Sequence, residues 1–72
     1  MEKDMTIKQI DRWVEQEAAK AKTLADCKRR LASLHREEVL MRTYGIFGKY
    51  PNAQKAHDKL VKLLEGRLKK NA

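Results

Sequence analysis

Apolar and small residues recur from residue 7 to residue 41 at steps of three and four, with no glycine or proline between them. This spacing places them on one stripe of a helix. Two glutamates, Glu17 and Glu38, interrupt the stripe, so we interpret it as a surface that meets another helix. We therefore predict a long amphipathic N-terminal helix whose partner lies within the chain or on a second copy. The stripe contains Ile7, Ile10, Val14, Ala21, Leu24, Cys27, Leu31, Leu34 and Met41.

The start and the continuity of this helix depend on two local signals. Thr6 and Thr23 each have a hydrogen-bonding side chain three residues further on, which is the capping-box pattern of a helix N-terminus. The second box coincides with two successive steps of three in the stripe, a local overwinding. Two arrangements follow: one helix over residues 7–43, about 55 Å long, or two helices hinged near residues 22–26.

The helical pattern stops at Gly45, a residue type suited to a left-handed helix end. Residues 45–52 contain two of the three glycines and the only proline, so we predict a loop there. Asn52 is the predicted N-cap of a shorter amphipathic C-terminal helix. The fold class is therefore all-α, in one domain over residues 1–72 with frayed ends at 1–5 and 70–72. The apolar face of the last helix carries Ala53, His57, Leu60, Val61, Leu64 and Leu68.

Self-association follows from the single-helix arrangement. A last helix of about 25 Å covers less than half of such a rod and leaves its N-terminal part uncovered. A small core also needs a supplement, and oligomerisation is the one open to this chain. We therefore expect a helical bundle completed by homodimerisation, whereas the hinged arrangement gives a monomeric three-helix bundle. The predicted self-association residues are Ile7, Ile10, Trp13, Val14, Ala21 and Leu24.

Catalytic and metal chemistry find little support in the sequence. One cysteine, Cys27, excludes an internal disulfide, and with His35 and His57 it matches no zinc-ligand spacing. We interpret Cys27 as a packing residue and His57 as a buried, hydrogen-bonded one rather than as a pH-responsive group. We expect no enzymatic activity, cofactor, metal or small-molecule substrate. The lone thiol favours the cytoplasm, and no apolar run is long enough for a membrane span.

The net charge of +7 is uneven: the excess is 0 over residues 1–22, +2 over 23–45 and +5 over 46–72. A basic C-terminal half indicates an anionic partner, either an acidic protein or a nucleic acid. In the predicted loop, Phe47, Lys49 and Tyr50 contact a partner, or the two rings close the end of the bundle. The candidate contacts to an anionic partner or to phosphates are Lys28, Arg29, Arg30, Arg36, Lys55, Lys59 and Lys62.

These observations favour a non-enzymatic accessory or regulatory protein that self-associates and acts by binding another macromolecule, in the first place a protein. The alternative is a small basic nucleic-acid-binding protein that contacts phosphates through its Arg and Lys side chains.

Overall fold

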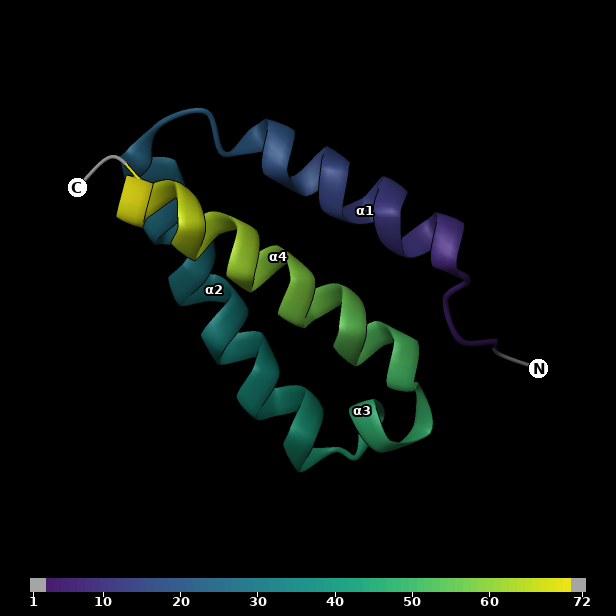
Figure 1. The fold of residues 1–72 in the computed structure, drawn as a ribbon. Coiled ribbons are helices and arrows are strands. Elements are labelled where there is room, and N and C mark those ends of the chain that lie inside the picture. Colours follow the sequence, from purple (N-terminus) through teal and green to yellow (C-terminus); the bar gives the residue numbers. More distant parts are fainter. Residues whose placement is uncertain (1–2, 71–72) are drawn as a thin grey trace.

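A computed structural model of this chain describes residues 3–70, and over these residues the fold is all-helical, as predicted. The order of elements is α1 (Ile7–Lys20), α2 (Leu24–Thr43), α3 (Ile46–Lys49) and α4 (Pro51–Lys70) (Figure 1). The three longer helices pack as a small bundle. Of the predicted frayed ends, residues 1–2 and 71–72 lie outside the described part, whereas residues 4 and 5 contact α4 and Lys70 is still helical.

Of the two predicted arrangements, the hinged one is observed, and a continuous helix over residues 7–43 is wrong for this structure. α1 ends at Lys20, and residues 21–23 lead into α2. Thr23 caps α2 because its hydroxyl accepts from the backbone N–H of Asp26 at 3.0 Å while the Asp26 carboxylate accepts from the Thr23 N–H at 3.3 Å. The equivalent box at Thr6 is also formed. Both predicted capping boxes are thus confirmed.

The predicted loop over residues 45–52 is wrong in part, because it contains one helical turn, α3, and the start of α4. Gly45 has φ +69°, a left-handed conformation that ends α2 without a Cβ clash. The turn that follows buries Phe47, whose ring centroid lies 5.6 Å from that of His57. The segment therefore closes one end of the bundle.

The predicted N-cap role of Asn52 is also wrong. α4 begins at Pro51, since a proline without an N–H suits the first helical position, and Asn52 lies one residue inside the helix. The Asp4 carboxylate accepts from the N–H of Asn52 at 2.8 Å and from that of Ala53 at 3.2 Å, and the Ala53 N–H also donates to the Tyr50 carbonyl at 3.0 Å. The Asn52 side-chain amide instead donates to the carbonyl of Met5 at 2.7 Å. The N-terminal segment is thereby tied to the start of α4.

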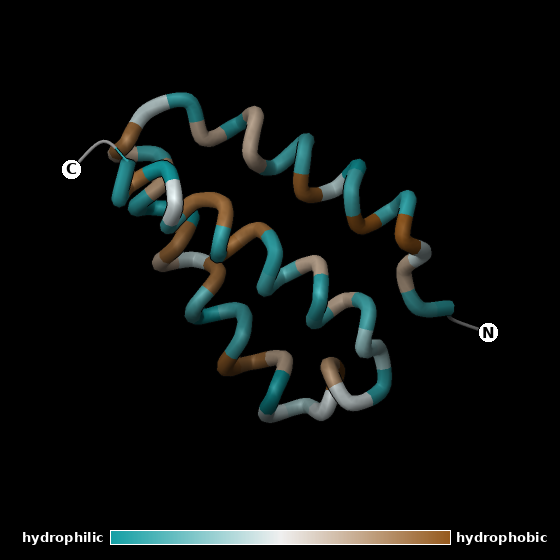
Figure 2. The backbone as a smooth tube through the Cα atoms, in the orientation of Figure 1, coloured by the Kyte–Doolittle hydropathy of each residue, from teal (hydrophilic) through white to brown (hydrophobic). Residues whose placement is uncertain are grey.

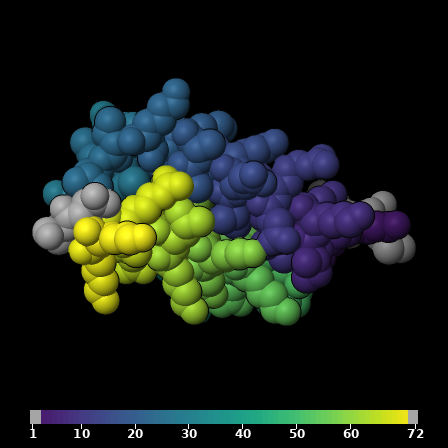
Figure 3. Space-filling view, turned by 45° about the horizontal axis from the view of Figure 1, so that its top comes forward, coloured from purple at the N-terminus to yellow at the C-terminus, as the bar shows by residue number. Residues whose placement is uncertain are grey.

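α4 is the central helix. It packs against both α1 and α2, whereas the backbones of α1 and α2 hardly approach each other. The apolar parts of α1 face α4 (Figure 2), and a space-filling view shows the two helices side by side along the molecule (Figure 3). The Cα atoms extend over 42 × 26 × 16 Å, so the bundle is elongated and rather flat. Its core includes Ile10, Val14, Ala18, Cys27, Leu31, Leu34, Ala56, Leu60 and Leu64.

Candidate functional site

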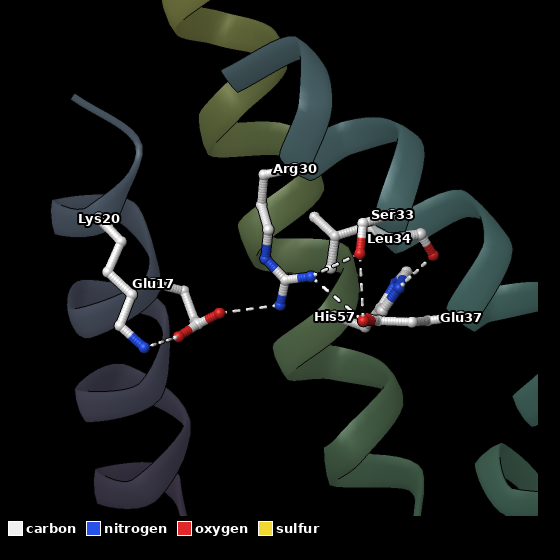
Figure 4. A network of polar contacts seen from close by, with 7 residues as sticks. All are labelled: Glu17, Lys20, Arg30, Ser33, Leu34, Glu37 and His57. Atoms are coloured by element: carbon white, nitrogen blue, oxygen red, sulfur yellow. Dashed lines mark hydrogen bonds and ion pairs between the residues drawn. The ribbon is translucent and has the colours of Figure 1, made fainter. Parts of the chain in front are cut away.

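A polar network joins α1 to α2 across the gap between them (Figure 4). The guanidinium of Arg30 on α2 donates to the carboxylate of Glu17 on α1 at 2.8 Å. Its other terminal nitrogen donates to Glu37 at 3.2 Å and to the hydroxyl of Ser33 at 3.1 Å. A side chain on α2 that bonds to both helices compensates for the few direct contacts between them.

The carboxylates of this region are held in their charged form. The hydrogen bond from Lys20, with the nearby charge of Arg30, keeps the pKa of Glu17 below its ordinary value of 4.5. Hydrogen bonds from arginines lower the pKa of Asp26 and Glu38 in the same way. The ion pairs on α1 and α2 are therefore formed at neutral pH.

A small cleft lies beyond this network, between α1 and α2 and away from the hinge. Its volume is about 120 Å³, which is close to the roughly 150 Å³ of an engineered cavity that binds benzene. It therefore has room for one apolar side chain. The N-terminal segment and α1 form one wall, α2 the other and α4 the floor; the lining residues are Met5, Trp13, Glu37, Met41, Ala53, Ala56 and His57.

His57 in the floor of this cleft is a packing residue. It is only 3% exposed, and its Nε2 lies 2.7 Å from the carbonyl oxygen of Leu34. Since a carbonyl oxygen only accepts, Nε2 carries a proton and donates it to this hydrogen bond. This arrangement agrees with the prediction of a buried, hydrogen-bonded histidine. The ring therefore has a structural role in the cleft.

Two exposed apolar residues lie on the same side of α2 as Glu37 and Met41, which line the cleft. Leu40 and Tyr44 continue the helical stripe of Glu37 and Met41, at spacings of three, four and seven. They are 57% and 75% exposed. The sequence analysis missed both, although the 37–40–41–44 spacing was the signal that indicated this second stripe. Together, the lining residues and these two residues form a surface that we call the open-end cleft.

The predicted self-association residues do not form one exposed surface. Ile10 is 5% exposed, and Val14 and Ala21 are buried with it against α4. Trp13 is partly buried and lines the open-end cleft. Only Ile7 and Leu24 lie on the surface. The stripe that was expected to be uncovered is covered by α4 because the hinge folds α1 back onto the chain.

Three of the predicted basic contacts form ion pairs within the chain, and four are exposed residues outside these pairs. Arg30 belongs to the network above, Arg29 pairs with Asp26 at 2.7 Å, and Lys59 pairs with Asp11 of α1 at 2.6 Å. The remaining predicted contacts are exposed on two different helices, α2 and α4, and are Lys28, Arg36, Lys55 and Lys62. The structure thus does not bring the seven residues together on one helix face.

The predicted loop contacts also separate. Phe47 is buried and closes the bundle, which was one of the two interpretations. Tyr50 is partly buried, and the ammonium of Lys49 lies 5.5 Å from the centre of its ring, a cation–π distance. Of the three residues, Lys49 remains exposed.

Comparisons with protein-family models, with curated proteins and with solved structures gave no match for this chain. Within residues 3–70, no helix has the length and apolar character needed to cross a membrane. The same residues contain no group of three or more His, Cys, Asp or Glu side chains placed to hold a metal ion.

Proposed function

We propose that this protein acts by binding another protein, and that the open-end cleft receives an apolar side chain of the partner. One observation carries the proposal: the exposed apolar residues Leu40 and Tyr44 lie on the same side of α2 as Glu37 and Met41, which line a cleft with room for a side chain. Exposed apolar residues that rim a pocket are typical of protein interaction sites.

The charges around the open-end cleft favour an acidic partner. Glu37, the carboxylate in the lining, is already bonded to Arg30. The exposed cations Lys3 and Arg36 lie on either side, the first beside Met5 and the second one turn before Leu40 on α2. A partner segment with carboxylates beside its apolar anchor complements this surface.

A non-enzymatic role is part of the proposal. The thiol of Cys27 is buried and donates to the carbonyl of Ala21, with sulfur and oxygen 3.7 Å apart. His57 is buried and bonded to the Leu34 carbonyl. The only cysteine and one of the two histidines are therefore used in packing, and the other histidine, His35, is exposed on α2. A free thiol is also consistent with the cytoplasm as the proposed compartment.

Site-specific photo-cross-linking in the native host tests this function. A benzophenone side chain at position 40 or 44 is expected to capture one discrete protein, which purified chain then binds in isolation. The matched control places the same group at Val39, which is 64% exposed but points away from the cleft on α2. Ala53→Leu, which fills the cleft, should abolish the adduct. Capture from position 39 with equal yield, or indifference to Ala53→Leu, contradicts the proposal.

The nucleic-acid alternative stays a prediction with fewer contacts. Three of its seven side chains are engaged in ion pairs inside the chain. On α4, the acidic Asp58 and Glu65 are exposed on the same helix as Lys55 and Lys62. Nuclease treatment before cross-linking separates a direct protein contact from one bridged by nucleic acid.

Homodimerisation also stays a proposal, but its basis changes. Because Ile10, Val14 and Ala21 are inside the folded chain, two folded copies have no access to them. A dimer that uses these residues requires that α1 leave its own chain.

A further inference from the structure

α1 is bound to the rest of the chain by contacts that a second copy supplies equally well. It packs on α4, where Lys59 pairs with Asp11 at 2.6 Å and Arg67 donates to the carbonyl of Ala18 at 2.8 Å. These partners are 48 and 49 residues apart in sequence. Only the segment 21–23 fixes which copy of α4 the helix meets.

The hinge itself is held by a short set of bonds. Residues 21–23 contain neither glycine nor proline, and the stripe of apolar residues continues across them with two successive steps of three, at Ala21, Leu24 and Cys27. The bend rests on the capping box of Thr23 and on the Ala21 carbonyl, which accepts from Arg67 at 3.3 Å and from Cys27. A straight helix over residues 7–43 replaces these bonds with ordinary backbone hydrogen bonds.

Helix directions allow the exchange. In the bundle, α1 runs parallel to α4 and antiparallel to α2 (Figure 1). When the hinge straightens, α1 continues in the direction of α2. Two straightened copies related by a two-fold axis perpendicular to the long helices lie antiparallel, so the α4 of one copy runs parallel to the α1 of the other. The parallel packing of α1 on α4 is thus preserved. The antiparallel arrangement of α1 and α2, which allows the ion pair between Glu17 and Arg30, is preserved as well.

We propose that two copies of this chain exchange α1 through a straightened hinge and form a domain-swapped dimer. The partner is a second copy of the chain, and the inference does not depend on another protein binding in the open-end cleft. Exchange of an identical element needs no new interface, because each contact is one that the closed chain already makes. It also keeps Ile10 and Val14 in a core while giving them the predicted role in self-association.

The ion pair between Asp11 and Lys59 provides a direct test. A carbodiimide joins the two side chains as an amide and takes up the water that is lost, so no spacer is added. In the dimer fraction isolated by size exclusion, we expect this amide to join Asp11 of one chain to Lys59 of the other. Chains labelled with heavy nitrogen are refolded with unlabelled chains, and the linked peptide of an exchanged dimer then combines one heavy half with one light half. Asp11→Asn is the control that removes the link.

Hinge variants test the same inference without cross-linking. Thr23→Ala removes the cap from the closed form alone. Since one cap is worth a factor of about 5 and a dimer has two, the dimerisation constant should rise about 25-fold. Lys22→Pro breaks a straight helix and should leave only single chains, and Lys22→Gly is the milder variant if the first does not fold.

Two results overturn the proposal. One is a mass of 8.4 kDa up to millimolar concentration for both the natural chain and Thr23→Ala. The other is a dimer in which the Asp11–Lys59 link is found only within single chains.

Discussion

Replacing Asp4 tests how a residue before α1 holds the start of α4. In Asp4→Ala the backbone amides of Asn52 and Ala53 lose an acceptor that lies 2.8 and 3.2 Å away. Loss of an N-cap acceptor costs about 1 kcal/mol, and loss of a negative charge at a helix N-terminus adds about 0.5 kcal/mol. We therefore expect the free energy of unfolding to fall by about 1.5 kcal/mol, which in a domain of this size lowers Tm by about 6 to 12 °C.

Urea unfolding followed by Trp13 fluorescence and by circular dichroism measures this change. The dependence of the free energy on urea should stay constant, since the surface exposed on unfolding is unchanged. Asp4→Asn keeps one acceptor oxygen and should cost about half as much. Asn52→Ala removes only the side-chain bond to Met5 and should cost about 0.5 to 1 kcal/mol. If Asn52→Ala is more destabilising than Asp4→Ala, then Asn52 is the functional cap and the assignment to Asp4 is refuted.

Three further predictions concern the turn, the network and the basic surface. Gly45→Ala should lower stability by about 1 to 2 kcal/mol in thermal unfolding because φ is +69°, whereas Gly48→Ala, with open space around its Cα, should not; equal effects contradict this. The lowered pKa of Glu17 adds stability above its ordinary value of 4.5 that is lost as the pH falls through the lowered value. The difference in unfolding free energy between the natural chain and Glu17→Gln should therefore shrink as the pH falls below 4.5 and through the lowered pKa of Glu17. A difference that does not change with pH refutes this prediction. If the four exposed cations bind DNA, the slope of log affinity against log salt should be about −3.6 between 50 and 200 mM, and Arg36→Gln should reduce it by about one; affinity weaker than about 0.1 mM at the lower salt removes this alternative.

Local signals in the sequence predicted the helix ends that depend on neighbouring residues. Thr6 and Thr23 cap helices as expected, because a capping box joins residues only three apart. The sequence left the hinge undecided, since the alanines around it favour a continuous helix. The bend is supported by Arg67, which donates hydrogen bonds to the carbonyls of Ala18 and Ala21 at the C-terminal end of α1, although it lies more than 40 residues away in sequence. Asn52 failed as a cap for the same reason, since Asp4 takes that role from the other end of the chain.

Only the buried residues of the candidate site could be predicted from the sequence. The position of His57 among apolar residues indicated burial, and the structure supplies the Leu34 carbonyl as its partner. Glu17, which interrupts the apolar stripe, finds its explanation in Arg30. The cleft itself depends on Met5, which lay in a segment expected to fray, and on Leu40, which lies off the main stripe. The spacing of Leu40 indicates a second stripe on α2 but not what faces it. Met5 carries no local signal, because the cleft exists only where the N-terminal segment meets α1, α2 and α4.

Cys27 lies beneath the hinge and gives this chain a built-in kinetic reporter. Its side chain is 2% exposed, and it is the only cysteine in the sequence, so a thiol reagent labels this position alone. Labelling requires that the hinge region opens. At reagent concentrations where labelling of the open form is faster than reclosing, the labelling rate equals the opening rate. A rate that is insensitive to denaturant identifies local release of the first helix, whereas a steep dependence identifies global unfolding. The lifetime of the closed hinge is thus measurable in the unmodified protein.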